Sequence, residues 1–311
     1  MSYSRRDLAR MAVAGLPLTR VLAKPIDSKV AGVQLGVQTY SFRDLEIDDA
    51  IKAIAADRLG DCELFSPHIE DGGVKAIMSL FEPRGGAQLS REEIGKAIKA
   101  YGDKVRQWRL TVPIDYFRQV RKKFDDAGIR IYAYNLSFQQ DFTDAEIDRC
   151  FLMAKALGVG LITSSTTLPV ARRVVPFAEK HKMLVAMHGH SDVEDPDQFA
   201  TPESFAKALA MSGQYRINLD IGHFTAAGFD AVDFIDKNHD KIVLLHLKDR
   251  KKNQGPNTPW GEGDTPIKEV LRLLRDKRYP IPAFIEYEYE GKGTSTEEVA
   301  KCLEYCKNAL A

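Results

Sequence analysis

Four short apolar segments in the second half of the chain each end in a histidine or a carboxylate. Their last residues are His188, Asp220, His246 and Glu286, which lie between about 26 and 40 positions apart. Each interval is about the length of one strand, one helix and two loops, which is the repeat unit of a (β/α)₈ barrel. The carboxyl ends of all strands in such a barrel meet at one face. The pattern therefore predicts that the four side chains converge on one site.

Apolar segments alternate with amphipathic ones along the rest of the chain. Near-continuous apolar strands that alternate with helices indicate a parallel sheet covered by helices, and eight such units indicate closure into a single (β/α)₈ TIM barrel. A doubly wound open sheet is the alternative, but no GxGxxG motif follows the first strand. The predicted strands lie at 36–42, 62–68, 129–138, 159–168, 184–192, 215–224, 242–250 and 281–290.

The segment 69–113, after the second strand, breaks this alternation. It contains several glycines and a proline, followed by a polar helix that begins after Ser90 with a glutamate three residues on, a capping-box pattern. A segment of this length between a strand and its returning helix is predicted to be an insertion. On the loop side of a barrel it could form a lid or a contact between copies in a homo-oligomer.

The charge balance limits the kinds of partner. The chain of 311 residues has 44 lysines and arginines and 44 aspartates and glutamates, so its formal net charge is zero. No global basic field attracts nucleic acid or anionic lipid. No apolar run approaches the ~18 residues that a spanning helix needs. We expect neither a nucleic-acid partner nor a membrane span.

The first residues resemble a twin-arginine export signal. Arg5 and Arg6 precede a modest apolar segment, although Asp7 follows the pair and Arg20 interrupts the end of that segment. The alternatives are a disordered basic tail and an amphipathic helix. We expect residues 1–27 to direct export to the periplasm, with 28–311 forming the barrel; without export the protein would be cytoplasmic.

Two imidazoles and two carboxylates without a thiolate are a typical ligand set for a transition metal. This combination suits one divalent ion, Mn²⁺, Co²⁺, Zn²⁺ or Fe²⁺. A site that uses the same groups for acid–base chemistry without a metal is the alternative reading.

Five segments together resemble the sugar phosphate isomerase/epimerase family of xylose isomerase-like TIM barrels. The likeness covers residues 35 to 311, and it implies metal ligation by the four strand-end residues and a small-molecule sugar substrate. The ketose epimerases of this family carry glutamate at the position of His188, so the histidine moves the likeness toward the inosose dehydratase-like branch. The matching segments are His188–His190, Leu219–His223, His246–Asp249, Gly261–Asp264 and Glu286.

A divalent ion that holds a carbonyl and the adjacent hydroxyl lowers the cost of an enediolate, and a positioned base removes the neighbouring proton. Return of the proton to carbon gives an isomerase or epimerase. Loss of an adjacent oxygen instead gives a lyase or dehydratase, either inosose dehydratase-like or acting by elimination from a keto-glycoside. Glu286 and His190 are candidates for the base, and a near-neutral pKa would let His190 act as the acid. Lys248 is placed to neutralise an oxyanion or phosphate, unless it forms a rim salt bridge with Asp249.

Other polar residues at strand ends and in the loops are expected to bind the substrate. Their positions follow from the same rule that places chemistry at the carboxyl ends of barrel strands. The predicted substrate-binding residues are Glu63, Tyr40, Asn135, His223 and Glu262.

Two other classes of function remain open. The segment LDIGHFTAAGFD is similar to part of the endonuclease IV-type nucleases, but the third strand ends in YAYNLSF without the histidine ligand that those enzymes need. The neutral charge also disfavours DNA. A non-catalytic sugar-binding barrel is the second alternative, and the presence of ligands at all four positions disfavours it.

Overall fold

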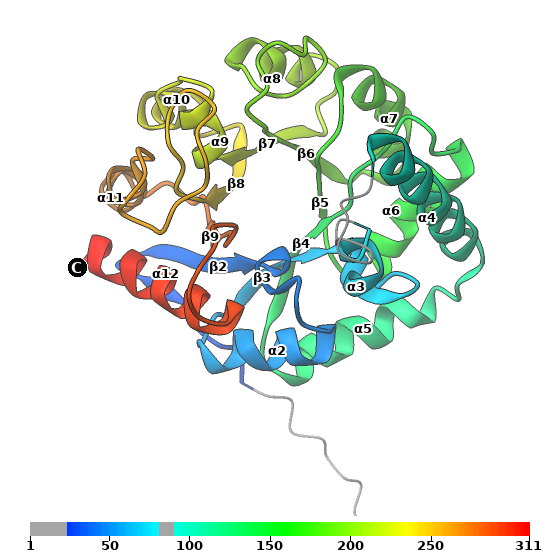
Figure 1. Cartoon of the computed structure of the whole chain (residues 1–311), viewed down its shortest axis with the longest axis horizontal. Helices are drawn as coiled ribbons and strands as arrows, with labels where there is room; N and C mark the ends of the chain where they lie inside the picture. Colours follow the sequence, from blue (N-terminus) through cyan, green and yellow to red (C-terminus); the bar gives the residue numbers. More distant parts are fainter. Residues whose placement is uncertain (1–23, 81–89) are drawn as a thin grey trace, which may run out of the picture.

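The computed structural model describes residues 24–80 and 90–311, and in this part of the chain it forms a closed eight-stranded parallel barrel surrounded by helices (Figure 1). Each strand pairs with the next in sequence, and β2 pairs with β9 to close the ring. The predicted fold is confirmed. The barrel strands are β2 (Val33–Gln38), β3 (Asp61–Phe65), β4 (Arg130–Asn135), β5 (Leu161–Ser164), β6 (Leu184–His188), β7 (Tyr215–Asp220), β8 (Ile242–Leu247) and β9 (Ala283–Ile285).

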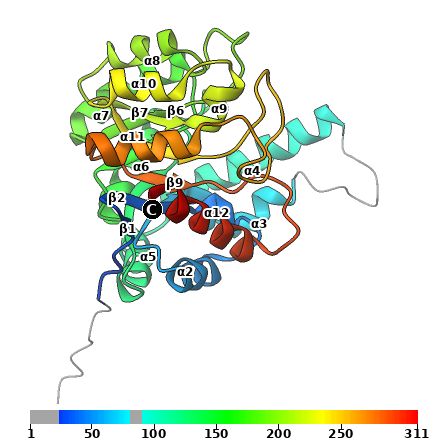
Figure 2. The same ribbon diagram turned by 90° about the vertical axis from the view of Figure 1, so that its left-hand side faces the viewer.

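Amphipathic helices cover the outside of the barrel, with α11 and α12 side by side at the front of Figure 2. In α11 the buried residues Ile267, Val270, Leu271 and Leu274 recur at helical spacing, so one stripe faces the strands. The helices are α2 (Ile47–Ala56), α3 (Gly73–Met78), α4 (Arg91–Thr111), α5 (Asp115–Asp126), α6 (Asp144–Ala156), α7 (Leu168–His181), α8 (Pro202–Leu209), α9 (Ile221–Ala226), α10 (Ala231–Asn238), α11 (Ile267–Lys277) and α12 (Ser295–Leu310).

The first barrel strand ends earlier than predicted. Residues Thr39–Phe42, expected in the strand, form the 3₁₀ helix η1, and a second 3₁₀ helix, η2 (Ser66–His68), follows β3. The Ser41 hydroxyl donates to the Ile285 carbonyl and accepts from the Tyr287 amide. The chain therefore bends at the top of β2 because these bonds tie it to the last strand. A short strand that was not predicted, β1 (Lys29–Val30), pairs antiparallel with β2.

Between β3 and α5 the described chain contains two helices within the segment 69–113: α4, which was predicted, and the short α3, which was not. The capping box at Ser90 is present. The buried Arg109 of α4 donates to Glu70 and to Glu146 of α6, which holds the helix against the barrel. Residues 81–89 of this segment and 1–23 of the predicted signal lie outside the described residues, so the lid and the signal remain predictions. Within 24–80 and 90–311 no helix is long and apolar enough to cross a membrane.

Candidate metal centre

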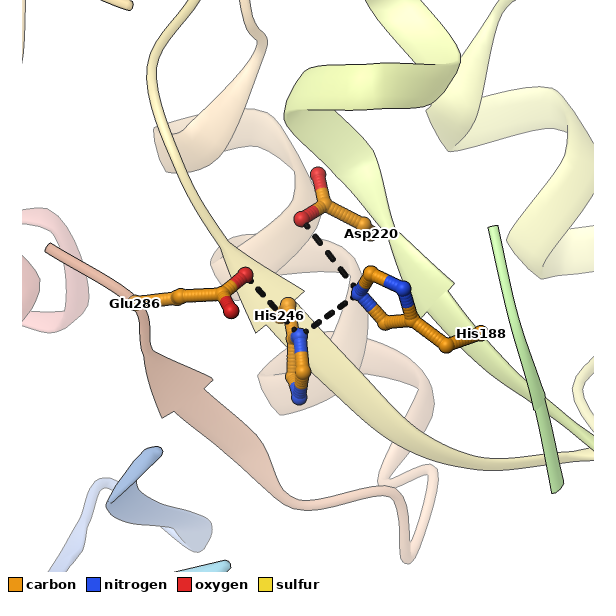
Figure 3. A group of neighbouring side chains, drawn as sticks. All are labelled: His188, Asp220, His246 and Glu286. Carbon is orange, nitrogen blue, oxygen red and sulfur yellow. Dashed lines mark hydrogen bonds and ion pairs between the residues drawn. The ribbon is translucent and has the colours of Figure 1, made fainter. Parts of the chain in front are cut away.

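The structure brings the four strand-end residues together inside the mouth of the barrel. His188 and Asp220 are the last residues of β6 and β7, His246 lies near the end of β8, and Glu286 directly follows β9. All four are buried, and one ligand atom from each lies within 4.8 Å of the others. Figure 3 shows the four side chains pointing toward a common centre.

The distances in this group fit a shared cation. The His188 Nε2 atom lies 2.9 Å from Nδ1 of His246 and 3.7 Å from Oδ2 of Asp220, and His246 Nδ1 lies 3.0 Å from Oε2 of Glu286. Asp220 Oδ2 and Glu286 Oε2 are both buried, and each lies 3.0 Å from the ammonium group of Lys248. Buried carboxylates are normally paired with a cation or coordinate a metal. These residues therefore fit a divalent ion with nitrogen and oxygen ligands.

A fifth buried residue fixes the orientation of His246. Glu63, which is 0% exposed, accepts a hydrogen bond from the His246 Nε2 atom. Thr163 also donates to Glu63, and the amides of Asn135 and Asn218 donate to it at 3.3 Å each. A carboxylate on the outer nitrogen of a ligating histidine sets the tautomer of the ring and leaves the inner nitrogen to the metal. Glu63 therefore holds Nδ1 of His246 toward the centre.

The electrostatics of His246 agree with this role. Burial alone would lower the pKa of His246, but Glu63 and Glu286 raise it well above its ordinary value. The imidazole then carries a proton on each nitrogen, one toward each carboxylate. A divalent ion would replace the proton on Nδ1, as metal binding at histidine does in general.

Lys248 supplies the positive charge nearest to the four residues. Its side chain is 2% exposed, and Nζ lies 3.0 Å from Asp220 Oδ2, 3.0 Å from Glu286 Oε2 and 2.5 Å from Glu288 Oε2. Burial would raise the pKa of both Asp220 and Glu286, but Lys248 and nearby histidines hold both well below the ordinary range. Both carboxylates are therefore ionised at neutral pH.

The alternative of a rim salt bridge between Lys248 and Asp249 is wrong. The Asp249 carboxylate instead accepts from the backbone amides of Gly261, Gly263 and Thr265, at 2.8, 3.0 and 3.2 Å. A Cβ on Gly263 would lie 1.9 Å from Asp249 Oδ1, so glycine is required there. The motif Gly261–Asp264 thus shapes the loop after β8.

A cavity of about 140 Å³ opens beside the four residues. Of the predicted site residues, Tyr40, Asn135, His190, His223 and Lys248 line it together with His188, His246 and Glu286. Neither Glu63 nor Glu262 is among its described lining residues. Glu63 is fully buried against His246, and Glu262 is exposed and lines a separate hollow beside α12. The lining residues that were not predicted are Gln38, Phe65, Ser137, Ser165 and Glu288.

The near-neutral pKa that would let His190 act as the acid is not found. Burial, the neighbouring His188 and Lys248 lower the pKa of His190 to about 4, so its ring is neutral at pH 7. A neutral imidazole can accept or donate a hydrogen bond but is not the cationic acid that was expected. Tyr40 differs, because burial and Glu288 raise its pKa, and its hydroxyl keeps the proton.

The chain matches the model of one protein family, described as xylose isomerase-like TIM barrel, over residues 70–308. L-ribulose-5-phosphate 3-epimerase UlaE of Salmonella paratyphi A is 29% identical to it over 97 residues, which are 31% of this chain and 34% of that protein. The Escherichia coli UlaE matches to the same extent. The chain thus spans about a third of the length of the curated relatives that it matches.

Two solved structures share the fold. A sugar phosphate isomerase/epimerase from Parabacteroides distasonis superimposes with a TM-score of 0.59 at 17% identity, covering 95% of this chain and 99% of that one. The probable 3-DHS dehydratase AsbF from Bacillus anthracis superimposes with a TM-score of 0.58 at 16% identity, covering 87% and 98%. At these identities the similarity concerns the architecture.

Proposed function

Because this chain belongs to the family of xylose isomerase-like TIM barrels, we propose that it is a divalent-metal-dependent isomerase or epimerase of a keto-sugar or sugar derivative. The reaction begins with removal of the proton next to the substrate carbonyl. The observation that carries the proposal is the convergence of His188, Asp220, His246 and Glu286, which are all buried and whose ligand atoms lie within 4.8 Å of one another.

These residues would hold one divalent ion, which when bound polarises the substrate carbonyl and hydroxyl. Glu286 is ionised, lines the cavity and is the carboxylate best placed to take the substrate proton. Lys248 faces the same space and can donate a hydrogen bond to an oxygen that gains negative charge. Tyr40, which retains its proton, supplies a second donor on the cavity wall.

A lyase or dehydratase reaction is the second candidate, and the observation that favours it is His188. With histidine at the end of β6, the cavity lacks a carboxylate there that could return a proton on the opposite face of the substrate. Elimination needs one base and one proton donor for the departing oxygen. Since His190 is neutral at pH 7, we assign this role to Tyr40 or Lys248, which both line the described cavity and carry a proton.

The test is proton exchange from keto-sugars and an inosose in D₂O, with protein loaded separately with Mn²⁺, Co²⁺ or Zn²⁺. We expect metal-dependent deuterium incorporation next to the carbonyl of at least one substrate, and its loss on chelation. Product analysis separates the two candidates, since epimers or isomers indicate the first and a dehydrated product the second. Glu290→Gln, which removes an equal charge at an exposed residue after β9, is the matched control for the Glu286→Gln variant. The absence of exchange from every substrate would contradict the proposal.

A further inference from the structure

We infer that the cavity accepts an uncharged keto-sugar and excludes a sugar phosphate. This inference rests on the proposed function and names its substrate class. It departs from the L-ribulose-5-phosphate epimerases that the chain partly matches. Four groups of contacts support it: the surroundings of Lys248, the partners of two nearby arginines, the loop after β8, and the backbone amides at the mouth of the barrel.

Lys248 is the one lysine or arginine among the described residues that line the cavity. It makes ion pairs with Asp220, Glu286 and Glu288, so three carboxylates surround one ammonium group. If a divalent ion takes up the charge of Asp220 and Glu286, Glu288 still neutralises Lys248 at 2.5 Å. A phosphate dianion in this cavity would be repelled by the Glu288 carboxylate, and it would have to displace that carboxylate to pair with Lys248.

Two arginines lie close to the lining residues, but both are engaged elsewhere. Arg43 stacks on the rings of Tyr40 and Tyr287 and donates to the Tyr287 carbonyl. Arg250 donates to the Gly255 carbonyl through two of its nitrogens and contacts Ser191 and His223 through the third. The Arg250 guanidinium therefore presents no free fork for two-point binding of a phosphate, and Arg43 is held against the two tyrosine rings and is not among the described residues that line the cavity.

In the loop after β8, the backbone amides that could bind an anion already bind a carboxylate of the protein. Phosphate sites in TIM barrels often use backbone amides from the loops after the last strands. Here three such amides, in the segment Gly261–Thr265, converge on one carboxylate, that of Asp249. Asp249 itself is buried, with 2% of the residue exposed. The amides that would hold a phosphate group therefore hold an aspartate.

Other amides at the mouth of the barrel also have partners from neighbouring side chains. The Tyr40 amide donates to Gln38, the Phe138 amide to Ser164, and the Ser165 amide to Ser137. In α9, which starts directly after β7, the His223 amide donates to the Asp220 carboxylate at 2.7 Å. An incoming phosphate would have to displace these bonds, whereas sugar hydroxyls can both donate to and accept from the polar side chains.

The experiment compares two ligands that differ only in phosphate, L-ribulose and L-ribulose 5-phosphate, by calorimetry on the metal-loaded full chain. We expect the wild type to bind the ester no more tightly than the free sugar, and to bind inorganic phosphate weakly. In Glu288→Gln the charge that neutralises Lys248 is gone, so affinity for inorganic phosphate should rise about tenfold or more. Glu290→Gln removes an equal charge at an exposed position and should show no gain.

Two results would overturn the inference. One is a wild type that binds L-ribulose 5-phosphate more tightly than L-ribulose. The other is a folded Glu288→Gln variant whose phosphate affinity equals that of the wild type. The wild-type titrations decide the matter even if the variant does not fold. If no sugar undergoes metal-dependent exchange, the proposed function fails, but the phosphate titrations still test the exclusion of anions.

Discussion

Replacement of Glu63 by glutamine tests whether this buried carboxylate sets the metal affinity through His246. In the wild type the carboxylate accepts from His246 Nε2 with one oxygen and from Thr163, Asn135 and Asn218 with the other. An amide nitrogen that faces His246 cannot accept a hydrogen bond. It would favour the tautomer with the proton on Nδ1, the nitrogen that the metal needs. In the opposite orientation the glutamine amide nitrogen would face the side-chain amides of Asn135 and Asn218, so that one donor would face two others.

The expected magnitude follows from the loss of one outer-shell partner. Such changes typically weaken metal binding by about 10- to 100-fold, or about 1.4 to 2.8 kcal/mol. The fold should survive, because glutamine has the same shape and Glu63 lies away from the helical layer. The loss should therefore appear in metal affinity before it appears in the melting temperature.

The assay is competition of the protein with a chelator for Co²⁺, together with the visible spectrum of the bound ion. Thr163→Val is the matched control, because it removes another hydrogen bond to Glu63 without touching His246. We expect a clearly larger loss in Glu63→Gln than in the control, and a changed spectrum. Equal affinities in Glu63→Gln and the wild type, or equal losses in the two variants, would refute the positioning role.

Three further predictions concern other parts of the chain. Glu286→Gln should abolish proton exchange, with metal content measured in parallel because Glu286 is also a candidate ligand; exchange at the wild-type rate would count against its role as base. Burial lowers the pKa of His68 to about 4, below its unfolded value of about 6.5. Between pH 4 and pH 6.5 the unfolded state therefore binds one more proton than the folded state. The free energy of unfolding should fall by about 3 kcal/mol as the pH drops from 6.5 to 4. Denaturant titrations of His68→Gln should show a smaller dependence of this free energy on pH, and equal dependences in the variant and the wild type would exclude this cause. Double replacement of Arg5 and Arg6 by lysine should retain the protein in the cytoplasm of a bacterial host without loss of activity, and unchanged periplasmic delivery, measured by fractionation, would argue against an export signal.

The barrel and the positions of the four candidate ligands could be predicted because they depend on local pattern. An apolar run of strand length that ends in a polar residue marks the carboxyl end of a barrel strand. Asp220 and His188 each occupy such an end, and closure of the barrel brings them together whatever the details of packing. The three histidines outside the site, His68, His181 and His239, form hydrogen bonds with a backbone carbonyl or an aspartate instead.

The roles that could not be predicted depend on partners far away in the sequence. Glu63 was expected to touch the substrate, yet its partners Thr163 and Asn218 lie 100 and 155 residues further on. The end of β2 at Gln38 is likewise set by bonds from Ser41 to the last strand, 244 residues away. Glu288 had a readable signal, since alternate residues of an extended strand face the same side and Glu286 was already assigned to the cavity.

The central claim is that four side chains hold one divalent ion, and elemental analysis after metal loading and desalting tests it most directly. The wild type should retain about one Mn²⁺, Co²⁺, Zn²⁺ or Fe²⁺ per chain. Asp220→Ala, shown to be folded by circular dichroism, should lose most of it, because Asp220 supplies a charged ligand at the centre of the group. A wild type without metal, or full occupancy in Asp220→Ala, would contradict the claim.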